Sequence, residues 1–150
     1  REARRNMMIA STIGGMAFIS SNVGAVHAFA ETVGAWFDTP HGVANSLFLP
    51  YIMEFNIPAC PERFADIADA MGIEREESMS DEQYALKAVE YVKALNRKLN
   101  IPTIKEIKGI TEERFEAIAE RSANNVLSND NARKITKEDY LELLKKAYNE

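Results

Sequence analysis

The sequence predicts an all-α protein, a compact bundle of about six to eight helices in one domain over residues 1–150. Apolar residues recur at helical spacing along the chain, and no segment alternates apolar and polar residues for long enough to form a strand. Residues typical of helix starts and ends bound the periodic segments. With 46% hydrophobic residues, a chain of this length can bury a core of its own.

The first two predicted helices are apolar. Residues 2–21 form the first, and the pair Gly14-Gly15 inside it suggests the close approach of another backbone, because glycine costs about 1 kcal/mol in a helix interior. Residues 22–36 form the second. Its alanines and glycines permit tight packing, so we expect it at the centre of the domain.

A turn over residues 38–42 leads into the third predicted helix. Pro40 suits the first position of that helix. Pro50 lies within it and is expected to bend or split it. Residues 56–61 then form a linker.

The second half has the pattern of amphipathic, solvated helices. The signals that bound them are Gly72 after a helix over residues 61–71, a Ser80–Gln83 capping box that opens a helix reaching about Leu99, and N-caps at Thr111 and Thr136. Ile67, Leu95 and Leu99 belong to the predicted buried stripes.

Charge and cysteine content exclude several classes of function. The chain has 23 acidic and 18 basic residues and a net charge of −5, which argues against nucleic acid or an anionic membrane as a partner. The single cysteine, Cys60, cannot form an internal disulfide, which fits a reducing cytoplasm. No membrane span or signal peptide is evident. The chain begins with Arg1 in mid-pattern, and we expect it to be a piece of a longer protein.

The only two histidines, His27 and His41, are the sharpest functional signal. Each lies in an apolar run, where an imidazole needs a polar partner or a metal. Two helices joined by a tight turn could bring both rings together and supply half of a four-ligand metal site. Glu31 lies four residues after His27 on the same helical face. It could be a third ligand, orient His27 or accept a proton.

Structural interpretations of the same residues stay open. Two histidines in a helical protein are more often hydrogen-bonded core residues than ligands. Glu31 could simply form an ionic contact with His27, and Phe18 could belong to the core. Gly42 and Asn45 could serve the turn and the cap only.

Several segments carry a resemblance to a known family: Gly15-Met-Ala-Phe18, Gly24-Ala-Val-His27-Ala-Phe-Ala, Gly34, Pro40-His41-Gly42-Val-Ala-Asn45, Leu49-Pro50 and Phe55-Asn56. In these the chain resembles the helical C-terminal domain of the iron-containing alcohol dehydrogenases. Weaker likeness continues to the end of the chain, through Glu62-Arg63-Phe64, Leu99-Asn-Ile-Pro102 and Ile135-Thr136-Lys-Glu-Asp139.

The resemblance implies a two-domain oxidoreductase that oxidises alcohols or reduces aldehydes. By motif position, His27 and His41 match two histidine ligands of Fe²⁺ (or Zn²⁺), and Phe18 matches a residue of the substrate pocket. NAD or NADP would bind an N-terminal α/β domain that is absent here. The implied partners are a small alcohol or aldehyde, that N-terminal domain and, in a homo-oligomer, a second copy of the chain.

Two departures from the family pattern matter. Glu31 stands where the family usually has a second histidine, and we hypothesise that it acts as the local base. The remaining ligands, an aspartate and a histidine, and the cofactor contacts come from earlier in the family's chain. The piece alone is therefore expected to be inactive. The alternatives are a non-catalytic helical interaction or oligomerisation module, and a metalloenzyme that uses His27, His41 and Glu31 by themselves.

Overall fold

The computed structural model describes residues 1–150 and confirms the all-α prediction, with seven α-helices, four short 3-10 helices and no strand. The α-helices are α1 (Glu2–Ser21), α2 (Ala25–Phe37), α3 (His41–Asn56), α4 (Pro61–Ala70), α5 (Asp81–Lys98), α6 (Phe115–Ala123) and α7 (Lys137–Asn149). The 3-10 helices are η1 (Ile57–Ala59), η2 (Ile104–Glu106), η3 (Glu112–Arg114) and η4 (Val126–Asp130).

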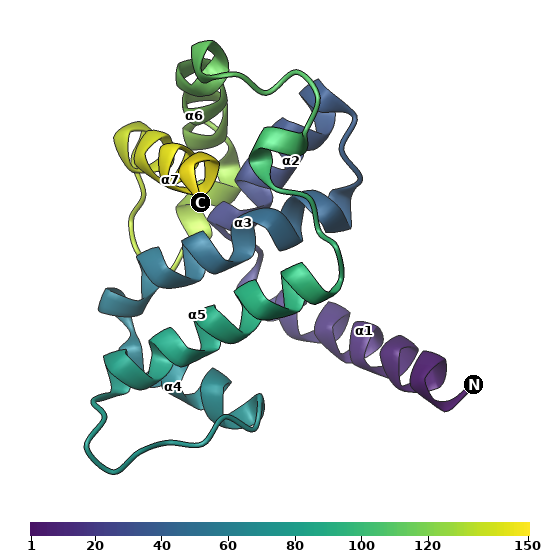
Figure 1. Ribbon diagram of the computed structural model, residues 1–150, viewed down its shortest axis with the longest axis vertical. Coiled ribbons are helices and arrows are strands. Elements are labelled where there is room, and N and C mark those ends of the chain that lie inside the picture. Colours follow the sequence, from purple (N-terminus) through teal and green to yellow (C-terminus); the bar gives the residue numbers. More distant parts are fainter.

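Helix α3 lies between two hydrophobic clusters and contributes to both (Figure 1). On one side, α2, α6 and α7 enclose a cluster of 18 buried residues. The ring of Phe29 stacks on that of Phe48 at 4.3 Å between centroids and meets the edge of Tyr140 at 4.7 Å. On the other side, α4 and α5 pack on the end of α3 around a cluster of 10 buried residues. The position of α3 is therefore fixed from both sides.

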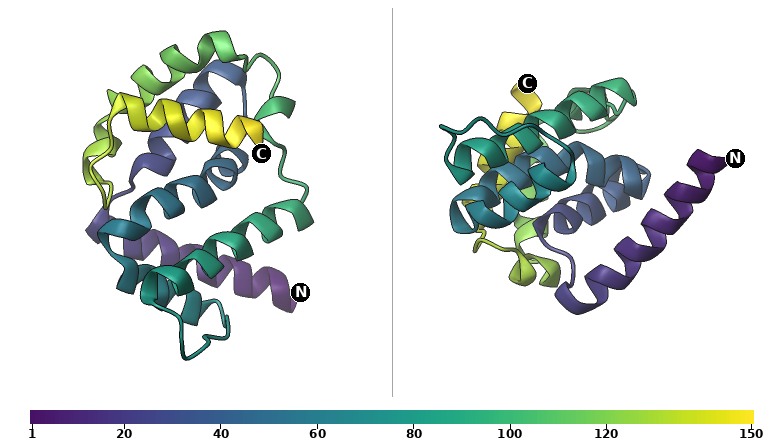
Figure 2. Two further views of the ribbon diagram at one scale, coloured as in Figure 1. Left: turned by 60° about the vertical axis from the view of Figure 1, so that its left-hand side comes forward. Right: turned by 90° about the horizontal axis from the view of Figure 1, so that it is seen from below.

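Helix α1 projects from the rest of the molecule, as the view from below shows (Figure 2). None of its residues is buried, although it exposes seven large apolar side chains: Met7, Met8, Ile9, Ile13, Met16, Phe18 and Ile19. Nothing lies within 4 Å of the position a Cβ would take at Gly14 or Gly15, so the expected close approach is not made within this chain. No single helix is both long and apolar enough to cross a membrane; only α1 and α2 together pass that test, and they are bent by 111°.

Most of the predicted helix boundaries are confirmed. The capping boxes at Ser80 and Thr136 are both formed, and Gly72 has the positive φ of 73° expected after a helix end. Two expectations were wrong. Helix α2 begins at Ala25, because the chain turns through Asn22 at φ 61°. Thr111 makes no side-chain cap, because η3 precedes α6.

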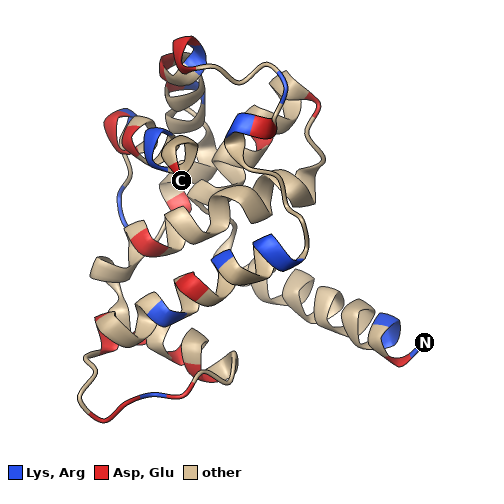
Figure 3. Cartoon of the chain, viewed as in Figure 1, with Lys and Arg blue, Asp and Glu red and all other residues tan.

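The charged residues follow the predicted division of the chain. They are spread over α4 to α7, whereas α1 carries charge only near its start and α2 and α3 carry little (Figure 3). The buried stripe of α5 is shorter than predicted, since Leu95 and Leu99 are 40% and 60% exposed. Helix α5 has 18 residues and its partner α4 has 10, so the last turns of α5 extend past α4. Ile67 of α4 is also 38% exposed.

Pro50 does not split α3, which runs unbroken from His41 to Asn56. A proline inside a helix removes the N–H that would bond to the carbonyl four residues earlier, here that of Ser46. That carbonyl instead accepts a hydrogen bond of 2.6 Å from the side-chain amide of Asn96 on α5. A side chain from the neighbouring helix thus replaces the missing backbone donor.

Removing this donor should destabilise the fold. We expect Asn96→Ala to lower the free energy of unfolding by about 1–3 kcal/mol, because the Ser46 carbonyl loses its partner. Urea denaturation measures the loss. In a Pro50→Ala background the same substitution should cost less, because position 50 then has its own N–H. Asn129→Ala, at an exposed position of η4, is the control. An equal loss in the two backgrounds would contradict this account.

Candidate metal-ligand site on helices α2 and α3

The inner face of α2 is held by a chain of buried hydroxyl groups. The Thr32 hydroxyl donates to the Ala28 carbonyl at 2.9 Å, and the Ser122 hydroxyl of α6 donates to Thr32 Oγ1 at 3.2 Å. Ser128 then bonds to the Ser122 carbonyl and to the Tyr140 hydroxyl, each at 2.7 Å. Helix α2 is therefore fixed against α6 and α7. His27 and Glu31 lie outside this buried face.

The connection from α2 to α3 folds back along α2. Asp38 ends α2 in the left-handed conformation, at φ 50°. A Cβ at Gly34 would lie 3.2 Å from the Thr39 carbonyl oxygen, so the returning chain packs on the bare backbone of α2. Pro40 is the N-cap of α3, one position before the expected one, and His41 is its first residue. This return brings the start of α3 back toward the first turn of α2.

The two imidazole rings meet at this point. Their centroids are 5.3 Å apart and their planes are inclined by 51°. Desolvation by burial lowers the pKa of His27 below its ordinary value, and the neighbouring His41 lowers it further, while Glu31 partly opposes the shift. The uncharged ring is the form that binds a metal.

The side chain of Asn45 contacts the His41 ring. Its side-chain Nδ2 lies 3.1 Å from His41 Nε2 and donates to the His41 carbonyl at 3.0 Å. An amide NH₂ group can only donate, so His41 Nε2 must accept and carries a lone pair. Asn45 Oδ1 is buried and has no hydrogen-bond partner. The contact therefore occupies the one lone pair of Nε2, and a metal bound there would displace the amide.

The histidines line a broad, open hollow of about 500 Å³ between α2 and α3. Its other walls are Asn45, Ser46 and small or apolar residues such as Val23, Val26 and Leu49. Two neutral imidazoles at an open face suit a borderline divalent ion such as Zn²⁺ or Fe²⁺. The chain contains no group of three or more His, Cys, Asp or Glu side chains that could hold a metal. Further ligands would have to come from outside this chain.

Glu31 is exposed, and Asn125 holds its carboxylate. Asn125 Nδ2 donates to Glu31 Oε2 at 2.7 Å. The orientation of that amide is fixed, because Asn125 Oδ1 accepts from the Leu127 N–H at 3.0 Å. Glu31 therefore makes no self-contained three-ligand site with His27 and His41. Its charge still acts on the His27 ring.

Phe18, expected at the substrate pocket, lies near the end of the projecting α1 and is 51% exposed. It is not among the residues that line the histidine hollow. The chain therefore brings His27 and His41 together but does not by itself bring Phe18 to them.

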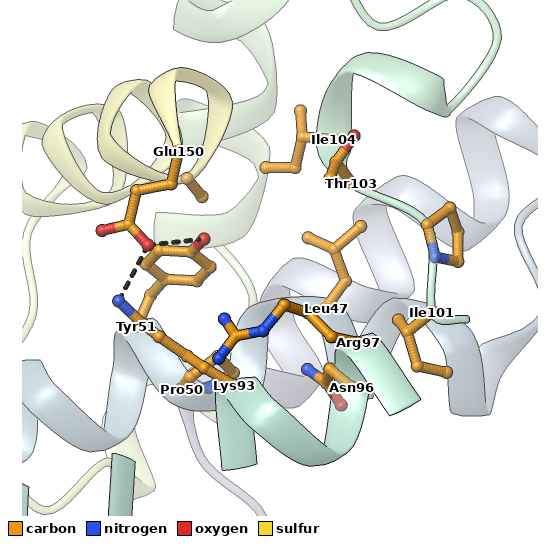
Figure 4. A pocket seen from close by; sticks show the side chains of 12 residues that line it. Leu47, Pro50, Tyr51, Lys93, Asn96, Arg97, Ile101, Thr103, Ile104 and Glu150 are labelled. Carbon is orange, nitrogen blue, oxygen red and sulfur yellow. Dashed lines mark hydrogen bonds and ion pairs between the residues drawn. The ribbon is translucent and has the colours of Figure 1, made fainter. Parts of the chain in front are cut away.

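A second, narrower hollow of about 160 Å³ lies between α3, α5 and α7 (Figure 4). The Glu150 carboxylate closes it, accepting from Lys93 at 2.8 Å and from the Tyr51 hydroxyl at 3.3 Å. Burial and the Glu150 charge raise the pKa of Tyr51 to about 12. Lys93 and Glu150 thus neutralise each other, Arg97 also lines the hollow, and we assign the hollow no chemistry.

Cys60 shows no sign of a reactive thiol. Burial raises the pKa of its Sγ, and Glu62 raises it further against the opposing effect of Arg63. The thiolate that a nucleophile needs is thus disfavoured.

The amides that surround the site were not predicted from the sequence. Asn125 and Asn131 contact α2 from positions about a hundred residues along the chain. The only signal for them was the density of asparagines between positions 124 and 131. Such residues are typical of turns, so the composition alone did not point to the histidines.

Comparison with known proteins finds relatives that match almost the whole of this chain. Residues 1–148 match the family described as "Fe-containing alcohol dehydrogenase family, C-terminal". Lactaldehyde reductase of Escherichia coli K12 is 37% identical over 148 residues, which are 99% of this chain and 38% of the relative. The NAD-dependent methanol dehydrogenase of Bacillus methanolicus is 32% identical over 146 residues, 97% of this chain and 38% of the relative.

The structural comparison agrees. The alcohol dehydrogenase of Oenococcus oeni superposes with a TM-score of 0.91 at 40% identity, over 98% of this chain and 38% of that structure. The chain thus spans little more than a third of the length of the proteins that it matches.

Proposed function

This chain belongs to the C-terminal part of the Fe-containing alcohol dehydrogenase family, and we propose that it supplies half of the metal-binding site of an NAD(P)-dependent alcohol dehydrogenase or aldehyde reductase. His27 and His41 would be the two ligands. The observation that carries the proposal is the pair of imidazoles with centroids 5.3 Å apart, held by two adjacent helices at an open hollow.

The residues present fit a divalent metal. Both donors are imidazoles, and a metal bound at His41 Nε2 would replace the Asn45 amide that lies 3.1 Å from this atom. When bound, the metal would polarise an alcohol or carbonyl oxygen and stabilise negative charge on it. The chain's own residues would orient the imidazoles and form one wall of the cleft. Phe18 would contribute to the substrate pocket once α1 is covered.

The nicotinamide cofactor would bind the part of the enzyme that this chain lacks. The name of the Bacillus methanolicus relative supports NAD, and that of the Clostridium saccharobutylicum relative, an NADPH-dependent butanol dehydrogenase, supports NADP. The exposed apolar side chains of α1 support a covering partner, because seven large apolar side chains on one projecting helix are unfavourable in water. We propose that the N-terminal part of the enzyme covers them. A cytoplasmic location, a small alcohol or aldehyde as substrate, and assembly into a homo-oligomer remain predictions.

The metal role predicts the effect of removing either imidazole. In the full-length enzyme, His27→Ala and His41→Ala should each lower Fe²⁺ or Zn²⁺ affinity by at least about tenfold, because one of a few ligands is lost. Elemental analysis after dialysis and titration calorimetry measure this loss. Asn124→Ala, an exposed amide at the end of α6, is the matched control. Wild-type metal content in both histidine variants would refute the proposal.

The isolated 150-residue chain should not catalyse the reaction. It holds two imidazoles and no third ligand beside them, so we expect weak metal binding and no alcohol-dependent reduction of NAD⁺ followed at 340 nm. The full-length enzyme under the same conditions is the positive control. Turnover by the purified chain would contradict the proposal that catalysis needs the rest of the enzyme. Stoichiometric tight metal in the chain alone would favour the self-contained metalloenzyme.

Glu31 is proposed as the local base. Asn125 holds Oε2, which leaves Oε1 as the oxygen that can take a proton. We expect Glu31→Gln in the full-length enzyme to lower kcat by about 10²-fold and to shift the pH–rate profile. The control is Glu90→Gln, an exposed carboxylate on α5. An unmoved profile in Glu31→Gln would remove the base role from this residue and leave its charge as the remaining influence on His27.

A further inference from the structure

We propose that Asn131 is a positioning residue for His27: it holds the first turn of α2 at a fixed place relative to α3 and thereby sets the spacing of the two imidazoles. This inference rests on the ligand role proposed for His27 and His41. It concerns a residue 104 positions from His27 in the chain that does not touch either ring.

Asn131 caps α2 from a distance. The N-cap residue of α2 is Gly24, which has no side chain to satisfy the free N–H groups of the first turn. Instead, Asn131 Oδ1 accepts from the Ala25 N–H at 3.3 Å, across 106 residues of chain. His27 lies two residues further on in the same turn. The cap therefore acts on the backbone that carries the candidate ligand.

The same amide is paired with the last residue of α3. Asn56 Nδ2 donates to Asn131 Oδ1 at 3.1 Å, and Asn131 Nδ2 donates back to Asn56 Oδ1 at 2.7 Å. Asn56 is only 7% exposed, so this pairing is shielded from water. Asn131 Nδ2 also donates to the Arg133 carbonyl at 2.8 Å. One side chain thus joins the start of α2 to the end of α3.

The contact with Asn131 leaves no room for a side chain at Gly24. A Cβ at position 24 would lie 2.9 Å from Asn131 Oδ1 and 3.3 Å from Asn131 Cα. The φ of Gly24 is −107°, which any residue can adopt. Glycine is therefore required here by the approach of Asn131 and not by the backbone conformation.

These contacts fix the imidazole pair through α3. His41 is the first residue of α3 and Asn56 is the last, so they are about 22 Å apart along the helix. The first turn of α2 is tied to the Asn56 end through Asn131, and His27 on that turn faces the His41 end. With α3 fixed by both hydrophobic clusters and the body of α2 held against α6 and α7, this tie through Asn131 fixes the first turn of α2, which carries His27. Coordination tolerates errors of only about 0.5 Å.

Neighbours of Asn131 support the tie. Asn22 Nδ2 donates to Asp130 Oδ2 at 2.9 Å, which joins the α1–α2 connection to the same loop. Arg133 Nη1 donates to the Phe55 carbonyl at 3.1 Å, and its guanidinium lies 4.2 Å from the centroid of the Phe55 ring. The loop is thus anchored to both α3 and the start of α2.

The test uses Cu²⁺ as a probe on the 150-residue chain, which has no other histidine. Electron paramagnetic resonance and spin-echo modulation count the imidazoles bound to Cu²⁺, with His27→Ala and His41→Ala as one-imidazole references. The unsubstituted chain should show two. Asn131→Ala should show one, with Cu²⁺ affinity lower by about tenfold, while circular dichroism shows a folded chain.

The matched control is Asn96→Ala. It also removes a hydrogen bond that an asparagine side chain makes to α3, but this asparagine lies on α5 and makes no hydrogen bond to α2. It should destabilise the fold and keep the two-imidazole signal. Equal loss of the signal in Asn96→Ala and Asn131→Ala would mean general loosening and overturn the proposal.

Gly24→Ala tests the contact between Asn131 and α2 from the α2 side. Its new Cβ would push on Asn131, so it should also reduce the two-imidazole signal, whereas Gly14→Ala, with no neighbour within 4 Å, should not. In the double variant the second substitution should add little, because both break one contact. A two-imidazole signal of normal affinity in Asn131→Ala overturns the positioning role alone. If the unsubstituted chain shows no two-imidazole signal, the ligand role of His27 and His41, on which the inference rests, is overturned.

Discussion

The packing of the Thr39 carbonyl on Gly34 is the constraint on which the candidate site depends. Any side chain at position 34 would put a Cβ 3.2 Å from that oxygen, and the connection could not run back so closely along α2. The return places His41 at the start of α3 beside the first turn of α2, although the two histidines are separated by the length of a helix and a turn. A contact between two backbones thus decides where two side chains meet.

Amide side chains supply hydrogen-bond partners to backbone groups that have none within their own helix. The start of α2 has a glycine in place of a capping side chain, and Asn131 supplies the acceptor. The interior of α3 contains Pro50, and Asn96 supplies the donor that the helix lacks. Asn45 and Asn125 hold His41 and Glu31 in the same way. The irregular backbone around the hollow is therefore stabilised by partners from α3, α5 and the loop after α6.

The parts of the structure that the sequence could predict are those decided by near neighbours in the chain. The caps at Ser80 and Thr136 each need residues within three positions, and the meeting of His27 and His41 needed only two helices and a short turn. The exposure of Leu95 and Leu99 depends on the length of α4, and the unbroken α3 depends on Asn96, so local pattern could not reveal them. The isolation of α1 was equally hidden, since its composition is that of a buried helix.

The separation in sequence of the contacts around α2 has a consequence for the order in which the chain folds. The imidazoles are brought together by a loop of 14 residues, whereas the bond from Ala25 to Asn131 closes a loop of 106. Long loops close later and at a greater entropic cost than short ones. We therefore expect the two rings to become neighbours early in folding, before the bond from Ala25 to Asn131 closes. They reach their final spacing only when the C-terminal segment docks.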